Sequence, residues 1–288
     1  MSPTAIVLVL AAAIAHASWN LFSKQAATTG AAFFLWLVAA GAAIAYVPAV
    51  AGDVLISQPR LTGLSWIFLV GTGVLQSAYF LFLQTGYGLG DLSVVYPIGR
   101  GSGAMLAALG GIALLGERPG PVSIAGIVAI IGGAVLVGTP GAASQRRPGP
   151  KVVVFALVTG VFIASYTIWD KYAVGTLHTP PILQGYAAFP VMAVVLTPVV
   201  VRDRERVRKV WREFRPQAIG AAVLAPLSYI LVLAALSFTA VSVVAPAREV
   251  SVLFGVLLGG RLLGEGGLAR RLTGAAAIVA GIIAIAIG

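Results

Sequence analysis

Long apolar runs dominate this chain, and short clusters of proline, glycine and charged residues separate them. A helix that crosses a membrane needs about 17–25 mostly apolar residues, and proline, glycine and charge mark its ends. The pattern predicts ten spans, near 3–22, 31–50, 62–84, 92–115, 121–138, 152–170, 181–201, 217–236, 241–263 and 271–288. The expected fold is therefore an all-α integral membrane protein with ten transmembrane helices.

The chain also contains an internal duplication. Three dispersed segments recur at spacings of 147, 149 and 148 residues: Ala17–Lys24 as Ala164–Lys171, Ser93–Pro97 as Ser242–Pro246, and Leu114–Glu117 as Leu262–Glu265. Five spans in each copy would make the second copy enter the membrane from the side where the first ends. We therefore expect two inverted five-helix repeats around a central cavity, a design common among secondary transporters.

The repeats set the expected domain organisation. The first repeat should occupy residues 1–140 and the second residues 152–288. Between them, residues 141–151 are polar, basic and rich in glycine and proline, which is typical of a linker.

Composition supports a membrane location and excludes several classes of protein. Hydrophobic residues make up 59% of the chain and charged residues only 10%, where a soluble domain has about 25% charged residues. The mean hydropathy is +0.99. The absence of cysteine excludes disulfides and cysteine nucleophiles.

The net charge of +10 reflects basic loops rather than nucleic-acid binding. No RNA- or DNA-binding module accompanies the basic residues, and seven of them lie in the 202–215 loop. The loops on that side of the predicted spans hold thirteen Lys and Arg residues, and those on the other side hold three. The positive-inside bias then places the 202–215 loop in the cytoplasm and both termini outside.

The sequence contains no catalytic or metal-binding constellation. It has two histidines, and no His, Asp or Glu cluster shows metal-ligand spacing. We therefore expect neither a cofactor, a metal nor an enzyme. An intramembrane enzyme acting on lipid stays a remote alternative, and a channel would need a ring of matching polar groups.

Charges inside spans are costly and mark functional sites. Arg100 lies in the fourth predicted span, and Arg248 and Glu249 lie in the ninth. Arg100 and Glu249 are 149 residues apart and so occupy equivalent places in the two repeats. We predict an ion pair between them, which either holds the helices together or binds substrate.

Polar and aromatic side chains from both repeats predict a cavity of mixed character. The expected substrate contacts are Asn20, Gln76, Tyr79, Arg100, Tyr229 and Glu249, with His16, Tyr96, Tyr166 and Arg248 as secondary candidates. For three aromatic residues, Trp19, Tyr166 and Trp169, a belt at the membrane surface is the favoured alternative.

Small residues recur at every fourth position of the fourth span, at Gly99, Gly103, Ala107 and Gly111. Such a stripe lets helix backbones approach closely. The favoured interpretation is packing within one molecule. A seam between two copies is the alternative, so the protein is expected to be a monomer or a homodimer.

These features together resemble the EamA-type drug/metabolite transporter family. The resemblance rests on the ten spans, the five-plus-five duplication, and a proline followed by Leu-Leu-Gly-Glu at the end of the fourth and ninth helices. Here those motifs are Pro97 with Leu114–Glu117, and Pro246 with Leu262–Glu265. The resemblance implies a helical basket with a central cavity, in the cell (inner) membrane. Members are commonly described with cytoplasmic termini, which is opposite to the charge count.

The expected function is secondary transport or export of small metabolites by alternating access. The resemblance implies amino acids and other small metabolites as solutes, and the predicted cavity residues would suit amphoteric metabolites but also drugs. Proton coupling is an open alternative. Efflux of drugs or toxic compounds is the second function considered. The expected partners are a small-molecule substrate and the lipid bilayer, with no nucleic acid.

Overall fold

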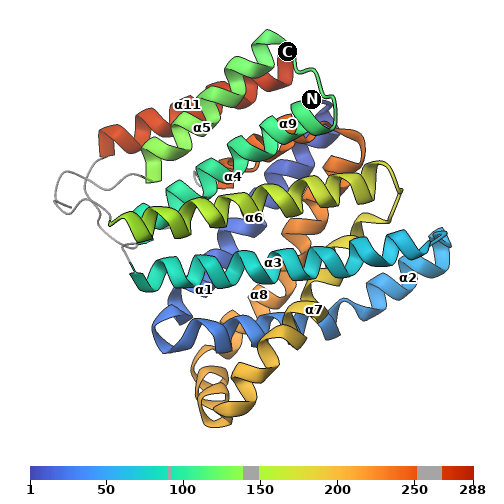
Figure 1. The fold of residues 1–288 in the computed structure, drawn as a ribbon, viewed down its shortest axis with the longest axis vertical. Coiled ribbons are helices and arrows are strands. Elements are labelled where there is room, and N and C mark those ends of the chain that lie inside the picture. Colours follow the sequence, from blue (N-terminus) through green and yellow to red (C-terminus); the bar gives the residue numbers. More distant parts are fainter. Residues whose placement is uncertain (90–91, 139–148, 252–267) are drawn as a thin grey trace.

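A computed structural model describes residues 1–89, 92–138, 149–251 and 268–288 of the chain. The regular structure in those residues is helical (Figure 1). The predicted linker at 141–151 lies largely outside them, as does most of the predicted ninth span.

The first repeat contains α1 (Pro3–Ala45), α2 (Val47–Ser57), α3 (Gly63–Leu89), α4 (Leu92–Leu114) and α5 (Pro121–Gly138). Two predicted spans follow one another within α1, which is bent at Gly30. The φ angle of Gly30 is 137°, a conformation that residues with a Cβ rarely adopt. Glycine at this position therefore lets the chain turn back without an intervening loop.

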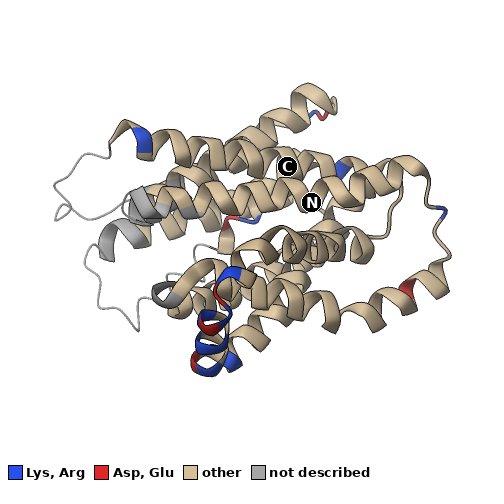
Figure 2. Cartoon of the chain, turned by 60° about the horizontal axis from the view of Figure 1, so that its bottom comes forward, with Lys and Arg blue, Asp and Glu red and all other residues tan. Residues whose placement is uncertain are grey.

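The second repeat contains α6 (Pro150–Gly175), α7 (Pro181–Arg202), α8 (Arg204–Phe238), α9 (Val241–Ala247) and α11 (Leu268–Ile287). Phe214 interrupts α8 with non-helical angles, φ −123° and ψ 26°. The residues before this break carry most of the basic cluster predicted in the 202–215 loop, and Figure 2 shows them gathered at one corner of the molecule. The apolar remainder of α8 forms the eighth predicted span.

The length and apolar composition of the helices support some of the ten predicted membrane spans. Within the described residues, five helices are long and apolar enough to cross a membrane, and the bent pair Gly30–Ala45 and Val47–Ser57 makes a sixth. Three shorter apolar helices, Ile98–Leu114, Pro121–Leu136 and Leu272–Ile287, correspond to further predicted spans. The protein is thus a multi-pass membrane protein, and the full number of ten spans stays a prediction.

Helix contacts repeat between the two halves. The α3–α6 contact has its counterpart in the α8–α1 contact. The two equivalent helices α5 and α11 pack along each other (Figure 1). These two contacts are what a pseudo-twofold axis between the repeats would produce.

The two first helices of the repeats run in opposite directions. The start of α1 lies beside the end of α11, since the Met1 ammonium donates to the Ile285 carbonyl at 3.1 Å. The end of α6 reaches the same end of the bundle, where Lys171 Nζ donates to the carbonyls of Leu236 at 2.7 Å and Thr239 at 2.9 Å. This antiparallel relation is what inverted repeats require.

The Leu-Leu-Gly-Glu motif of the first repeat caps a helix of the second. Glu117 accepts from the backbone N–H groups of Val241 at 2.7 Å and Ser242 at 2.8 Å, at the start of α9. A carboxylate there satisfies otherwise unpaired N–H groups and interacts favourably with the helix dipole. Glu117 thereby ties the end of α4 to the start of α9.

The stripe of small residues packs within the molecule, as the favoured interpretation predicted. Side chains of α6 lie against Gly99 and Gly103, through Thr159 and Ile163. On the facing helix, a Cβ at Gly160 would lie 3.0 Å from the Gly103 nitrogen and 3.1 Å from the Gly99 carbonyl oxygen. The α4 and α6 backbones are therefore in direct contact at this point.

Substituting Gly160 is expected to separate α4 from α6. Because backbone atoms cannot move aside as a flexible side chain can, Gly160→Leu should reduce stability by about 1–3 kcal/mol, measured as thermal unfolding in detergent. Gly132→Leu is the matched control, since a Cβ there would meet nothing within 4 Å. Equal unfolding temperatures for the two variants would contradict the close contact.

The predicted orientation can be tested with single cysteines, because the chain has none of its own. Ser57 and Arg208 are both exposed. Ser57→Cys should react with a membrane-impermeant thiol reagent from outside the cell, and Arg208→Cys only from the cytoplasm. Labelling of both from one side would show that the span count is wrong, and reversed labelling would show that the orientation is wrong.

Candidate functional site

An internal cavity lies between the two repeats. It has a volume of about 60 Å³ and is lined by residues of α1, α3 and α4 on one side and of α6, α7, α8 and the end of α9 on the other. A water molecule needs about 10–15 Å³ of such space. The cavity therefore holds only a few waters, and a larger solute requires the helices to move.

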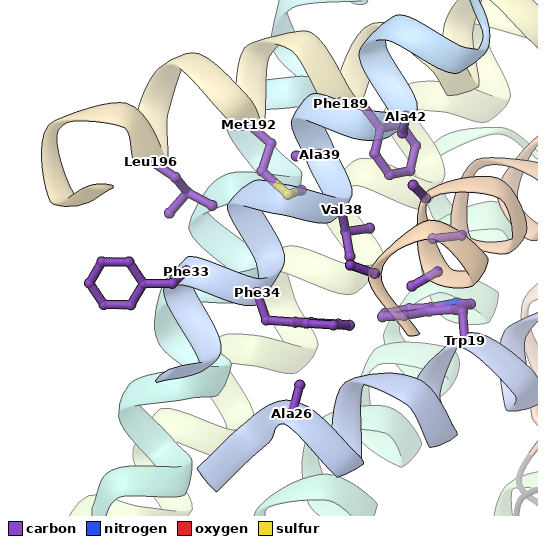
Figure 3. Close-up of a cluster of buried hydrophobic side chains, with 14 of the residues drawn as sticks. Trp19, Ala26, Phe33, Phe34, Val38, Ala39, Ala42, Phe189, Met192 and Leu196 are labelled. Atoms are coloured by element: carbon purple, nitrogen blue, oxygen red, sulfur yellow. The ribbon is translucent and has the colours of Figure 1, made fainter. Parts of the chain in front are cut away.

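One wall of the cavity belongs to a buried apolar cluster. Figure 3 shows this cluster, in which Trp19 and Val38 of α1 lie near Phe189 and Met192 of α7. All four of these side chains also line the cavity. Most lining residues are aromatic or aliphatic, so the site favours a solute with an apolar part.

The predicted ion pair forms beside the cavity, with Arg100 in the lining. Arg100 Nη2 lies 2.8 Å from Glu249 Oε1, and Arg100 Nε donates to Glu249 Oε2 at 3.3 Å. Both residues are buried, with 6% and 4% of their surface exposed. The arrangement is bidentate and joins the two repeats, and Arg100 also reaches His16 Nε2 at 3.4 Å.

A second arginine reaches the cavity directly after the end of α9. Pro246 lies inside α9, and α9 ends at Ala247. The next residue, Arg248, lines the cavity, with its guanidinium carbon 5.6 Å from the centre of the Tyr229 ring.

A buried carboxylate, Asp170, lies directly behind the cavity wall. It is fully buried. Its oxygens accept from Thr72 Oγ1 at 2.9 Å, from Gln184 Nε2 at 2.7 Å and from the Tyr229 hydroxyl. These donors come from α3, α7 and α8, so Asp170 joins three helices to α6.

Two cavity residues connect this carboxylate to the open space. Gln76 lines the cavity and donates through Nε2 to Thr72 Oγ1 at 3.2 Å, and Thr72 in turn donates to Asp170. Tyr229 lines the cavity with its ring and bonds Asp170 through its hydroxyl. The Asp170 network therefore fixes the orientation of two residues that face a solute.

Most of the predicted contact residues are brought together here. The cavity lining includes His16, Gln76, Tyr79, Arg100, Tyr166, Tyr229 and Arg248. Glu249 lies behind Arg100 and is not part of the lining. The Asn20 amide returns to the His16 carbonyl of its own helix at 2.8 Å and is also outside the lining. The Tyr96 side chain lies outside the described part of the structure.

The predicted aromatic belt is wrong for two of its three members. Trp19 and Tyr166 are buried and line the cavity. Trp169 stacks on Phe68 with 4.1 Å between ring centres and donates to the Phe68 carbonyl at 3.0 Å. Tyr166 instead stands edge-on to both Tyr79 and Tyr229, at 5.8 Å from each.

Asp170 and helix α7 were not among the predicted site elements. The available signal was an acidic residue within the sixth predicted span, the same signal that identified Glu249. The α7 contribution, through Phe189 and Met192, is apolar and carries no such signal in the sequence.

Comparison with known proteins agrees with this architecture. The model of the EamA-like transporter family matches residues 3–139 and again residues 150–287. The chain belongs to the EamA-like transporter family. The two matches correspond to the two repeats, and members of this family are transporters, so a site between the repeats of this EamA-like chain is a candidate solute site.

A solved crystal structure of another protein has the same fold. The match has a TM-score of 0.72 and covers 98% of this chain and 98% of that chain, at 17% sequence identity. At this identity the likeness concerns the fold alone. No curated protein matches the chain.

Proposed function

We propose that this EamA-like chain is a secondary transporter that carries small organic solutes through the cavity between its repeats by alternating access. The observation that carries the proposal is the cavity itself, where two arginines and several aromatic side chains from both repeats converge. Inverted repeats allow one half to rock against the other around a fixed central site. The small cavity volume then corresponds to a closed stage of the cycle.

The Arg100–Glu249 pair supports the same proposal because it connects the moving parts. Arg100 belongs to the first repeat and Glu249 to the second, so relative motion of the repeats changes their environment. Glu249 acts as the counter-ion of Arg100 in the closed stage. Under proton coupling, Glu249 would also carry the proton when Arg100 turns to the substrate.

Transport by purified protein in liposomes tests the proposal. A panel of amino acids, other small metabolites and cationic drugs, offered with and without a pH gradient, separates metabolite transport from drug efflux. We expect saturable uptake of at least one small metabolite, and faster uptake with a pH gradient if protons are coupled. Absence of saturable transport for every solute would reject the proposed function.

Substitution of Gln76 and Tyr79 tests whether the solute is transported through this cavity. Both line the cavity, and Gln76 is held in place by its bond to Thr72. Gln76→Ala and Tyr79→Ala should each raise the KM of the transported solute about tenfold, with unchanged amounts of folded protein. Unchanged KM values in both variants would remove them from the substrate path.

A further inference from the structure

We propose that the transported solute is an organic anion with an aromatic or apolar body, held by Arg248, rather than a zwitterion such as an amino acid. This inference rests on the proposed transport function and narrows its substrate class. It also departs from the amphoteric solutes expected from sequence, because the structure shows how the charges around the cavity are paired.

The described cavity wall carries positive charge without an accessible carboxylate. Its lining includes Arg100 and Arg248 and no Asp or Glu. The two nearby carboxylates are already engaged, since Glu249 is bound by Arg100 in a bidentate pair and Asp170 accepts from three donors. An entering ammonium group would therefore meet two guanidinium groups and no carboxylate in this part of the wall.

Arg248 differs from Arg100 in its surroundings. Arg100 forms a salt bridge with Glu249. Among the described residues, Arg248 has no such salt bridge within 4.0 Å, although the Asp170 carboxylate is near enough to interact with it electrostatically. Arg248 lies over the Tyr229 ring and faces the cavity. A guanidinium inside a membrane protein is stabilised by a partner with negative charge, and a planar carboxylate offers it two parallel hydrogen bonds.

The remaining wall selects the body of the solute. Among the described residues, five aromatic side chains besides Tyr229 line the cavity: Trp19, Tyr79, Phe80, Tyr166 and Phe189. Aromatic rings pack favourably edge-to-face or offset against one another. Tyr166 and Tyr79 already adopt such geometry, at 5.8 Å. An aromatic carboxylate placed with its charge at Arg248 would bring its ring among these side chains.

Four small probes that share a phenyl ring and differ in charge test the inference. They are phenylacetate (anion), phenylalanine (zwitterion), phenethylamine (cation) and phenylacetamide (neutral). Competition for bound radiolabelled phenylacetate on purified protein gives the four affinities. We expect phenylacetate to bind about tenfold or more tightly than the other three.

Substituting Arg248 separates a specific charge contact from general apolar binding. Arg248→Gln should weaken phenylacetate about tenfold to a hundredfold while leaving phenylacetamide unchanged, and Arg248→Lys should retain part of the preference. Arg212→Gln, in the exposed basic segment before the α8 break, should change neither affinity. If Arg248→Gln does not fold, the order of the four binding affinities on the wild-type protein tests the anion preference.

Three results would overturn the inference. They are phenylalanine binding as tightly as phenylacetate, no binding of phenylacetate, and an equal loss of affinity for all four probes in Arg248→Gln. The liposome panel keeps this test apart from that of the function. Transport of other solutes without a preference for anions rejects the anion inference alone. Absence of transport for every solute rejects the proposed function, whatever the binding order.

Discussion

Asp170→Ala should destabilise the protein by about 3 kcal/mol or more. The change removes the acceptor of three donors, Thr72, Gln184 and Tyr229, in a place with no solvent access. Each buried donor left without a partner costs about 1–3 kcal/mol. Thermal unfolding in detergent, followed by the loss of monodisperse protein, measures the effect.

Two controls accompany the Asp170 variant. Asp170→Asn keeps one acceptor oxygen and should fall between wild type and Asp170→Ala. Ser165→Ala, on the exposed side of the same helix, should stay within about 0.5 kcal/mol of wild type. If Asp170→Ala and Ser165→Ala unfold at the same temperature, the network does not hold the four helices together.

Breaking the Arg100–Glu249 pair should have a comparable effect on stability and a separate effect on transport. Arg100→Leu or Glu249→Leu alone leaves one buried charge without its partner, at a cost of about 3–5 kcal/mol. The double variant Arg100→Leu/Glu249→Leu removes both charges and should recover most of the folded protein. We expect this recovered protein not to transport, because the pair takes part in solute movement.

The double-mutant cycle distinguishes the two interpretations left open by the sequence. Unfolding of the two single variants and the double variant gives the coupling energy between the side chains. Arg60→Leu, at an exposed position outside the spans, is the charge-matched control and should change neither stability nor transport. Full transport by the double variant would show that the pair has a structural role alone.

The sequence was sufficient for the ion pair because two independent constraints met there. Charges inside a membrane need partners, and the repeat places Arg100 and Glu249 at equivalent positions. Their contact at 2.8 Å follows from both. The helical class, the two repeats and most of the polar residues in the cavity lining could be predicted for similar reasons, since apolar length, internal similarity and polar residues within spans are properties of the sequence itself.

Asp170 was not predicted as a site residue because it lies next to Lys171. Asp170 and Lys171 are adjacent and lie at the end of a predicted span, where charges ordinarily reach the membrane surface. Successive residues of a helix point about 100° apart. In the structure, Lys171 extends to backbone carbonyls at the end of the bundle, whereas Asp170 turns inward to three donors.

Asn20 is the converse case, a residue that the sequence pattern predicted as a substrate contact but that does not line the cavity. It shares a helix face with His16, which lines the cavity. Its amide nevertheless bonds the carbonyl of His16 one turn earlier. Such local bonding of a side chain to its own backbone competes with outward contacts, and spacing along the sequence does not indicate which of the two will form.

A cysteine at Ser228 tests most directly whether the cavity is the transport path. Ser228 lines the cavity, is 4% exposed, and donates to the Ala225 carbonyl of its own helix. We predict that Ser228→Cys reacts with a membrane-impermeant thiol reagent from either face of the membrane in sealed vesicles, that reaction blocks transport, and that a transported solute slows it. A Ser228→Cys protein that transports normally and stays unreactive from both faces would contradict the account.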